Sequence, residues 1–379
     1  MRKNRADPVH IMYSCDAFAK LGIKVTLVTP TIKYKNCVIQ KSEIFKIYGL
    51  EDKFDIVELP TNLSEADLQK SGFIKIIYNR FYIHLKFLIK NRKLFTDNET
   101  LIYSKCFIST LPYIIFRKLK LINSKIVSEL HYAKKNIFHK YILHNSDYVV
   151  ASSRKLISRL VNEFKLQNNR IIKIPVRLII EDIHLKKGIS KFECRKYFNF
   201  TKNDIYIIHT GKVGKNMIVS DQFIRLSQEL PDYKFIIICR NNEMIDYYNN
   251  LNIKNLIIFP FLQFPELNKL IIASDILLAL YEYNEYNKYY LGPSKAGQYL
   301  FSGNPVILSD LPSLRERFSD EIAYFCDTTD ISNVITIINQ IINNSSDMYR
   351  MKIKKAKAFS LKHTYHHAAV GIIKFLKSR

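Results

Sequence analysis

Short apolar runs alternate with amphipathic stretches along the whole chain. Runs that are continuously apolar are typical of strands covered on both faces, and their alternation with helical stretches is typical of parallel sheets with helical crossovers. The rhythm occurs twice, which predicts two doubly wound α/β domains. The predicted strands are 24–30, 55–60, 100–105, 125–131, 148–153 and 171–175, followed by 204–211, 234–240, 255–261, 276–282, 305–310 and 323–326.

The two arrays are separated by residues 176–203, which contain no clean strand pattern and are rich in Lys, Glu and Asp. From about Ile331 the pattern predicts helices only. We therefore expect an N-terminal domain over 1–178, a C-terminal domain over 179–360, and a final helix over 361–379 that crosses back to the first domain.

The first predicted element is a helix. Asp7 and Pro8 are typical of a helix start, the pattern continues to Lys20, and Gly22 is a typical helix end. A doubly wound domain normally opens with its central strand and a glycine-rich turn. Neither is found before this helix, so we expect either that the coding sequence begins upstream of Met1 or that the domain lacks its first strand.

The net charge of +24 is concentrated in the first half of the chain. Residues 1–180 carry 32 Lys and Arg against 14 Asp and Glu, whereas the remainder carries 26 against 20. Such a field attracts phosphate groups of anionic lipids or nucleic acids. No nucleic-acid-binding motif is found, which favours the membrane, and a biased base composition of the gene is the other explanation.

Residues 73–93 contain basic residues among bulky apolar and aromatic ones, and no acidic residue. This pattern predicts a helix that lies in a membrane interface, although a core helix with a basic outer face has a similar pattern. No apolar run approaches the length that crosses a bilayer, and the six cysteines are scattered, without a CxxC pair.

Three segments after predicted strands are candidates for chemistry. The first contains Gly292, Pro293, Ser294, Lys295 and Gln298, in which a tight turn at Gly292 leads into a helix that is predicted to begin at Pro293. The free N–H groups of a helix start, together with a lysine, favour a phosphate, and Gln298 lies one turn further in. An ordinary capped helix explains the same residues.

The second segment contains Gly211, Lys212, Gly214 and Lys215 after an apolar strand. Glycines let the backbone approach a ligand, and two lysines can meet a pyrophosphate. A surface loop with ordinary lysines explains the same residues.

The third segment ends a strand at His131, which we expect to face a cleft between the domains, or to be structural. His363, His366 and His367 form a further group, which we interpret as solvated or packed because no carboxylate or cysteine accompanies them.

The sequence resembles the group 1, or family 4, retaining glycosyltransferases. Gly292–Pro305 resembles their pattern S-P-x-K-x-x-E-Y-x-x-x-G-x-P, and Val306–Glu316 fits the strand and turn that follow. Residues 255–281 are similar to the preceding part of the family pattern, and Ala17–Val28 to its first helix and second strand. The resemblance covers nearly the whole chain and implies a GT-B fold, with two Rossmann-like domains that face each other across a cleft.

The resemblance also implies donor-site residues. Lys212 occupies the place of an Arg or Ser that follows a glycine, here Gly211, and an ungapped match puts Met217 at a phosphate-binding lysine, with Lys215 as the candidate substitute. Basic residues of this kind stabilise the leaving diphosphate, with retention and without a metal or other cofactor. His131 resembles a histidine near the transferred sugar, so the implied catalytic residues are His131, Lys212 and Lys215.

Further donor contacts follow from the same match. Phe261 and Leu262 fall in the base-contacting loop, Gln298 takes the place of a ribose-binding glutamate, and Tyr290 stands where many members have another glutamate. Gly292, Pro293, Ser294 and Lys295 complete the implied site.

These features predict a cytoplasmic enzyme, peripheral at the inner face of a bacterial cell membrane. We expect it to move a sugar from a nucleoside-diphosphate sugar to a glycolipid or polysaccharide acceptor, as in lipopolysaccharide and cell-envelope assembly. A catalytically impaired homologue that binds nucleotide as a partner subunit is the alternative, and a sugar-nucleotide epimerase on the same architecture is another. A nucleic-acid-binding function is disfavoured.

Overall fold

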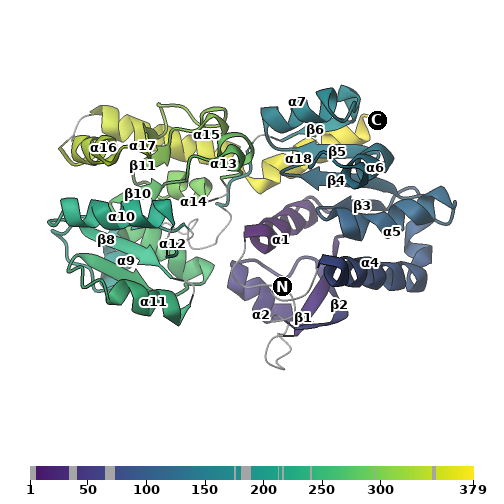
Figure 1. The fold of residues 1–379 in the computed structure, drawn as a ribbon, viewed down its shortest axis with the longest axis horizontal. Helices are drawn as coiled ribbons and strands as arrows, with labels where there is room; N and C mark the ends of the chain where they lie inside the picture. The colour runs from purple at the N-terminus through teal and green to yellow at the C-terminus, as the bar shows by residue number, and fades with distance from the viewer. Residues whose placement is uncertain are drawn as a thin grey trace. The chain divides into compact units, whose positions relative to one another are not determined.

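The computed structural model describes residues 6–33, 41–64, 73–174, 176–180, 189–211, 213–215, 217–239, 241–293, 295–343 and 347–379 (Figure 1). The chain divides into two compact units. Unit 1 comprises Met1–Ile44, Asp52–Pro175 and Ala369–Arg379, and unit 2 comprises Phe45–Glu51 and Val176–Ala368.

All twelve predicted strands are confirmed. Those of unit 1 are β1 (Thr26–Lys33), β2 (Asp55–Ser64), β3 (Leu101–Ser104), β4 (Lys125–Leu130), β5 (Tyr148–Ala151) and β6 (Ile171–Lys173). Those of unit 2 are β7 (Tyr206–His209), β8 (Lys234–Ile238), β9 (Leu256–Phe259), β10 (Ile276–Ala279), β11 (Val306–Ser309) and β12 (Tyr324–Cys326).

Unit 2 contains one parallel sheet with the order β12-β11-β10-β7-β8-β9. Its helices are α9 (Lys191–Tyr197), α10 (Ile218–Glu229), α11 (Asn242–Asn249), α12 (Phe264–Ala273), α13 (Glu285–Tyr290), α14 (Ala296–Phe301), α15 (Pro312–Arg315), α16 (Ile331–Asn343) and α17 (Asp347–Lys362). The helices after Ile331 agree with the predicted all-helical end of the chain.

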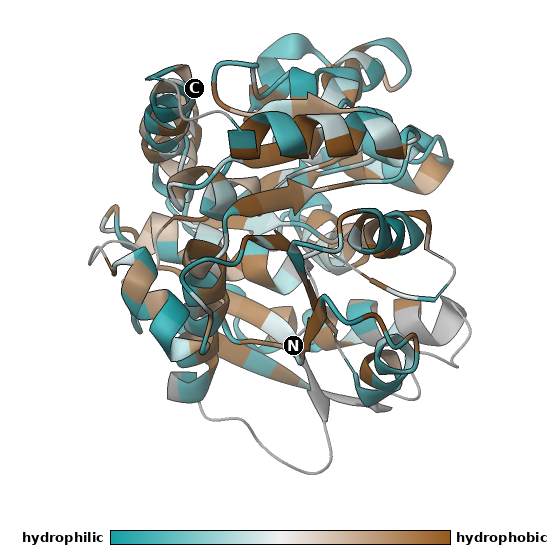
Figure 2. Cartoon of the chain, turned by 90° about the vertical axis from the view of Figure 1, so that its left-hand side faces the viewer, coloured by the Kyte–Doolittle hydropathy of each residue, from teal (hydrophilic) through white to brown (hydrophobic). Residues whose placement is uncertain are grey.

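Alternate residues of the unit 2 strands enter two separate apolar layers. Ile208 and Leu277 belong to a layer with α12 and α14, whereas Ile207 and Leu278 belong to a layer with α10 and α16. The strands consist mainly of hydrophobic residues, while the helices carry both hydrophobic and hydrophilic residues (Figure 2). Both faces of the sheet are thus covered, which is the reason that the strands are continuously apolar in sequence.

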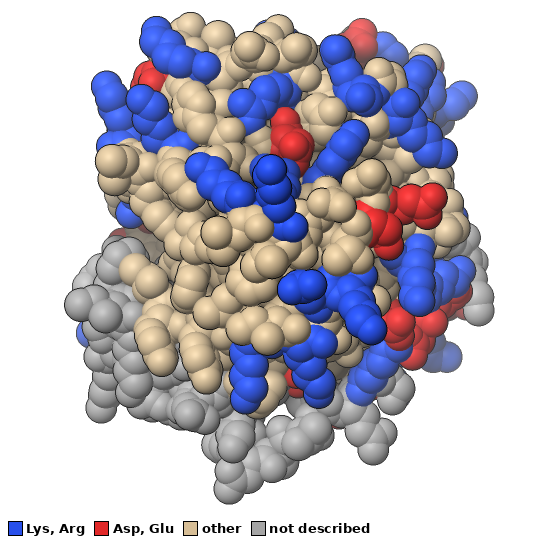
Figure 3. All heavy atoms as spheres, turned by 90° about the vertical axis from the view of Figure 1, so that its right-hand side faces the viewer, with Lys and Arg blue, Asp and Glu red and all other residues tan. Residues whose placement is uncertain are grey.

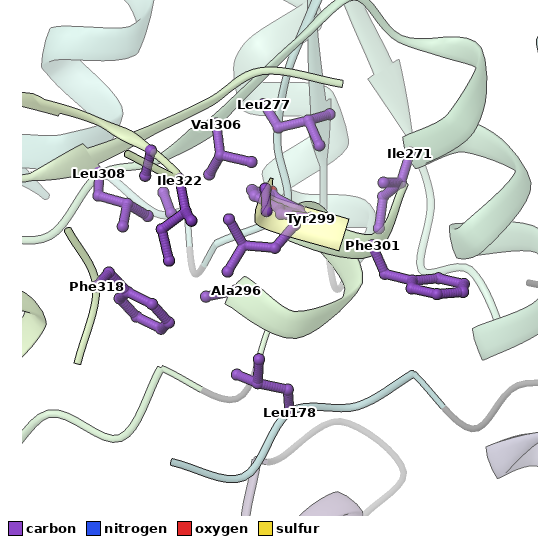
Figure 4. Packing of buried hydrophobic residues seen from close by; sticks show 14 of the residues in the cluster. Leu178, Ile271, Leu277, Ala296, Tyr299, Phe301, Val306, Leu308, Phe318 and Ile322 are labelled. Carbon is purple, nitrogen blue, oxygen red and sulfur yellow. The ribbon is translucent and has the colours of Figure 1, made fainter. Parts of the chain in front are cut away.

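The short helix α14 lies deep in the first of these layers (Figure 4). Tyr299 and Ala296 are both fully buried there. A Cβ atom at Gly297 would overlap Leu178 and approach the backbone nitrogen of Ile179 to 2.7 Å. Glycine is therefore the residue that lets the chain pass this close to α14.

Unit 1 contains two parallel sheets among its described residues, with the orders β1-β2 and β3-β4-β5-β6. In the doubly wound order the first strand lies between the second strand and the fourth. Since β1 and β3 correspond to that second and fourth strand, the separation falls where a first strand would lie. The alternation of strands and helices in the sequence predicts a single sheet for this domain. The described residues form two sheets instead, because no central strand joins β1 to β3 among them.

The described helices of unit 1 surround these sheets. They are α1 (Ala6–Ala19), α2 (Lys41–Tyr48), α4 (Phe73–Lys90), α5 (Phe107–Lys118), α6 (Ile137–Asn145), α7 (Arg154–Asn162) and α18 (Tyr365–Lys377). Helix α2 continues into unit 2, and α18 belongs to unit 1 from Ala369 onward. Two 3-10 turns accompany them, η1 (Arg92–Phe95) and η2 (Asn168–Arg170). Among the residues described, no helix is both long and apolar enough to span a bilayer.

The first helix and the last agree with the sequence expectations. Helix α1 buries Met12, Tyr13 and Ala17 completely and is followed by Gly22 with φ of +78°. At the other end of the chain, Phe375 of α18 lies edge-on against Tyr148 of β5, with ring centroids 5.5 Å apart. The C-terminal helix therefore returns to the first domain, as predicted.

Candidate functional site

The strand order of unit 2 reverses between β7 and β10. Strands β8 and β9 follow β7 on one side, and β11 and β12 follow β10 on the other. Ligands of doubly wound sheets bind outside the carboxyl ends of the strands at such a reversal. The residues that leave β7 here begin with Thr210 and Gly211, and those that leave β10 begin with Leu280 and Tyr281. A ligand site is therefore expected at this end of the sheet.

Tyr299 connects the loop after β7 to α14. Its hydroxyl oxygen accepts a hydrogen bond from the Thr210 N–H at 2.9 Å and lies 2.7 Å from Thr210 Oγ1. Burial raises the pKa of Tyr299 to about 12, so the hydroxyl stays neutral. Two segments that the sequence offers as separate candidates are thus brought together in one unit.

His209, the last residue of β7, is completely buried beside this loop. Its Nδ1 lies 3.1 Å from the Leu278 carbonyl oxygen of β10, which can only accept a hydrogen bond, so Nδ1 carries the proton. Nε2 is then a bare acceptor, and no described group bonds to it. Burial, and to a lesser degree the charge of Lys295, lower the pKa of His209 to about 3.

This pKa predicts a loss of stability in acid. Unfolded His209 takes up a proton below about pH 6.5 and the buried ring only near pH 3, so the free energy of unfolding should fall by about 2 kcal/mol between pH 6.5 and pH 5. His84 of unit 1, whose pKa burial lowers to about 4, acts in the same direction. Denaturant unfolding at a series of pH values should therefore give a flatter profile for His209→Leu than for the unchanged protein.

Phe223 provides the control for this measurement. Its ring centroid lies 5.8 Å from that of His209 and it does not titrate. Phe223→Leu should lower the free energy of unfolding equally at every pH, because it removes packing alone. A His209→Leu profile as steep as that of Phe223→Leu would contradict the assignment of His209 as a buried neutral base.

Lys295 supplies positive charge at the same place. It is half-buried, its Nζ lies 4.9 Å from the ring centroid of Tyr281, and its charge acts on His209. Tyr281 follows β10, and burial raises its pKa. Lys295 therefore lies near the last residue of β7 and near a residue that follows β10.

The helix after Lys295 differs from the prediction. The pattern predicts a start at Pro293, but α14 begins at Ala296 with Lys295 as its N-cap, and the Ala296 N–H bonds to the Pro293 carbonyl oxygen at 3.0 Å. Before it along the chain, Pro293 is buried and Gly292 is exposed. Because α14 is so short, the Lys295 side chain, rather than a helix dipole, carries the positive charge here.

Gln298 is buried inside unit 2. Its Nε2 donates a hydrogen bond to Asn268 Oδ1 at 3.0 Å, and only 3% of the residue is exposed. The residue that the resemblance assigns to a ribose contact therefore connects α14 to α12.

A second helix start lies closer to β7. Helix α10 begins at Ile218, with Met217 as an N-cap whose side chain makes no capping hydrogen bond. The resemblance treats Met217 only as a replaced lysine, whereas the structure shows amide groups of a first turn that lack a side-chain cap. Lys215 is exposed just before this start, with its Nζ 5.9 Å from the ring centroid of Tyr247.

The other predicted donor contacts are spread over the end of the sheet. Phe261 follows β9 and is 39% exposed, while the neighbouring Leu262 packs against the apolar layer with α14. Tyr290 closes α13 and is buried. Lys212 and Ser294 lie outside the described residues.

In unit 1, His131 belongs to a cluster around Glu129. The Glu129 side chain is fully buried, and its Oε1 lies 2.6 Å from His10 Nε2, 3.3 Å from Lys105 Nζ and 3.8 Å from His131 Nε2. The Tyr103 hydroxyl donates to Oε2. The cluster lies where β3 and β4 end, and the candidate site of unit 2 likewise lies at the carboxyl ends of its strands.

Sequence reasoning selected His131 and missed its partners. The spacing of Glu129 and His131 is a usable signal, because alternate residues of a strand lie on one face. His10, Tyr103 and Lys105 give no such signal, since helix α1 and strand β3 meet β4 only in the folded chain.

The sequence matches no family model and no curated protein. Solved structures are similar in fold. A sucrose-phosphate synthase of Thermosynechococcus elongatus shows 13% identity over 99% of this chain and 93% of that chain, with a TM-score of 0.71. A glycosyltransferase of Rickettsia africae shows 13% identity over 94% and 98%, with a TM-score of 0.64. Anabaena HepE in complex with UDP and glucose shows 13% identity over 93% and 100%, with a TM-score of 0.62.

These likenesses extend over nearly the full length of both chains in each case. Together with the parallel sheets of the two units and the return of the C-terminal helix, they define the chain as a member of the GT-B fold class. This is the fold class, with two Rossmann-like domains, that the sequence predicts.

Proposed function

We propose that the protein is a glycosyltransferase that moves a sugar from a nucleoside-diphosphate sugar to an acceptor. The observation that carries the proposal is the reversal between β7 and β10, where His209, Gly211 and Lys295 gather at the carboxyl ends of the strands. The similar structures include one with UDP and glucose bound, which supports a donor of this class.

The donor diphosphate would meet Lys295 and the uncapped first turn of α10. Positive charge and amide groups that are already in place stabilise the charge that develops on a leaving diphosphate. We include Lys212, Lys215, Gly292, Pro293 and Ser294 in this group on the resemblance. The proposal requires no metal ion or other cofactor, and it assigns retention to the transfer.

The remaining donor contacts would hold the nucleoside. Phe261 and Leu262 would contact the base, and Tyr290 would support the donor from α13. Gln298 would reach a ribose hydroxyl only by giving up its hydrogen bond to Asn268. His131 would lie near the transferred sugar, as the resemblance implies.

We further propose a glycolipid or polysaccharide acceptor at the inner face of a bacterial cell membrane. Helix α4 has Tyr78, Tyr82, Lys86 and Ile89 on one exposed stripe, with the two tyrosine rings stacked 5.5 Å apart. Lys and Arg are spread over this side of unit 1 with few Asp and Glu (Figure 3). Aromatic residues among basic ones suit an anionic interface, whereas nucleic acid is not proposed as a partner.

The α4 stripe gives a testable binding surface. Lys86→Gln combined with Lys90→Gln should reduce partition onto vesicles that contain anionic phospholipid by about tenfold or more, because each lysine near the surface contributes about 1 kcal/mol. Vesicle sedimentation at low and physiological salt measures this.

The matched control changes two exposed lysines of unit 2. Lys196→Gln combined with Lys202→Gln alters the net charge equally. An equal loss of vesicle binding in both double variants would show a general charge effect and contradict a surface on α4.

A panel of nucleoside-diphosphate sugars tests the function itself. We expect calorimetry to show binding of one nucleoside diphosphate, and mass spectrometry to show sugar transfer to a membrane extract, or slow donor hydrolysis without an acceptor. Isomerised donor would indicate an epimerase instead. A well-folded protein that binds no nucleotide would exclude the proposal.

A nucleotide-binding partner subunit is the second candidate. The observation that favours it is Gln298, which lacks the charge of a carboxylate and is already bonded to Asn268. Nucleotide binding without turnover, together with a stable complex with an active transferase, would support this function. Gln298→Glu should then restore measurable turnover.

A further inference from the structure

One buried carboxylate meets two imidazole rings at the end of β4. The ring centroids of His10 and His131 lie 5.3 Å apart, and both rings lie within 4 Å of the Glu129 carboxylate. One ring nitrogen of each histidine and a carboxylate oxygen all lie within 4.8 Å of one another, which occurs for no other such group in the described part of the chain. These three side chains come from α1, from β4 and from the residue that follows β4.

We propose that His10, Glu129 and His131 bind a divalent transition-metal ion, and specifically Zn²⁺. Two imidazole nitrogens and one carboxylate oxygen are a zinc ligand set that leaves a fourth position open. With metal–ligand distances of about 2.1 Å, tetrahedral ligands lie about 3.4 Å apart. The observed separations of 2.6 Å and 3.8 Å from Glu129 Oε1 fall on either side of that value.

The surroundings of Glu129 suit a ligand carboxylate. The Tyr103 hydroxyl donates to Oε2, which leaves Oε1 directed at the two histidines. Such an outer hydrogen bond fixes the orientation of a metal-binding carboxylate. The side chain of Glu129 is fully buried while that of His131 is 33% exposed, so an ion can enter past His131.

Lys105 already places a cation beside the same oxygen. Its Nζ lies 3.3 Å from Glu129 Oε1, and its side chain is 16% exposed. A zinc ion would repel this ammonium group at such a distance, so the lysine must move toward solvent when the metal binds. Lys105 is therefore a competitor of the metal, and its removal should increase the affinity for zinc.

Zinc binding would also block the proposed role of His131. An imidazole nitrogen that coordinates a metal no longer accepts a hydrogen bond from a sugar hydroxyl. Zinc should therefore inhibit transfer rather than support it. This consequence rests on the proposed function, whereas the binding itself does not.

Calorimetry with Zn²⁺ and the absorption spectrum of the Co²⁺-loaded full-length protein, after chelator treatment, test the site. We expect one ion per chain and a tetrahedral Co²⁺ spectrum. His10→Ala and His131→Ala should each abolish that spectrum, and Tyr103→Phe should weaken affinity by about tenfold, as loss of an outer hydrogen bond does. Lys105→Met should bind zinc more tightly than the unchanged protein.

His366 on α18 provides the control, since it is a histidine next to another histidine, His367, in a different part of the chain. His366→Ala should leave the stoichiometry and the Co²⁺ spectrum unchanged. The proposal is overturned if the unchanged protein binds no zinc, or if binding survives in His10→Ala and His131→Ala. Lys105→Met keeps the test decisive should the histidine variants unfold, because unaltered or weaker zinc binding in that variant also overturns it.

Discussion

Lys295→Met is expected to reduce the turnover number for sugar transfer by about a hundredfold, the usual effect of removing one preorganised group that stabilises developing negative charge. Lys295 brings its charge to His209 at the end of β7, where the diphosphate of the donor is proposed to lie. Steady-state kinetics with the donor, and calorimetry with the free nucleoside diphosphate, measure the loss.

Lys269→Met is the matched control for this change. Both lysines lie over tyrosine rings, with Lys269 Nζ 4.2 Å from the centroid of Tyr197 and Lys295 Nζ 4.9 Å from that of Tyr281. Both variants therefore lose one positive charge and one cation–π contact of unit 2. Equal turnover numbers in the two variants would contradict a role of Lys295 in the donor site, whatever the stability of the variants.

Gly211→Ala is expected to lower the free energy of unfolding by about 3 kcal/mol, at the upper end of the usual cost of overpacking. A Cβ atom at this position would overlap the buried His209 ring, with Nε2 as its nearest atom and Cδ2 at 3.0 Å. The ring cannot easily move, because Nδ1 is bonded to Leu278. Denaturant unfolding measures the stability, and the donor affinity should fall with it as the loop is displaced.

A double-mutant cycle identifies the cause. In a His209→Ala background, Gly211→Ala should cost less than about 1 kcal/mol, since the ring that it would overlap is absent and the two changes couple. His209→Ala has a cost of its own, which the cycle subtracts. Additive effects of the two substitutions would mean that the glycine is needed for another reason.

The sequence indicated the fold class and the candidate segments of unit 2. Continuous apolar runs are local signals, so every strand could be located before its partners were known. The loop with Gly211 and the turn with Lys295 were selected because each follows a strand, and in parallel sheets the carboxyl ends of strands lie at one edge. His131 was selected on the same ground.

The partners of those residues could not be predicted in the same way. The hydrogen bond between Tyr299 and Thr210 and the effect of the Lys295 charge on the pKa of His209 both join residues that are far apart in sequence. The same is true of the contact between His10 of α1 and Glu129. The start of α14 at Ala296 was also missed, because turn geometry decides where a short helix begins.

By itself, the sequence determined that each of these segments is a strand and approximately where it lies, because a strand that is buried on both faces is apolar at consecutive residues. Only the tertiary structure decided the strand order, and with it the reversal between β7 and β10 and the separation between β1 and β3. The physical reason is that apolar strands of this kind can pair with many neighbours. The order is selected by the crossover helices and the packing of both layers together.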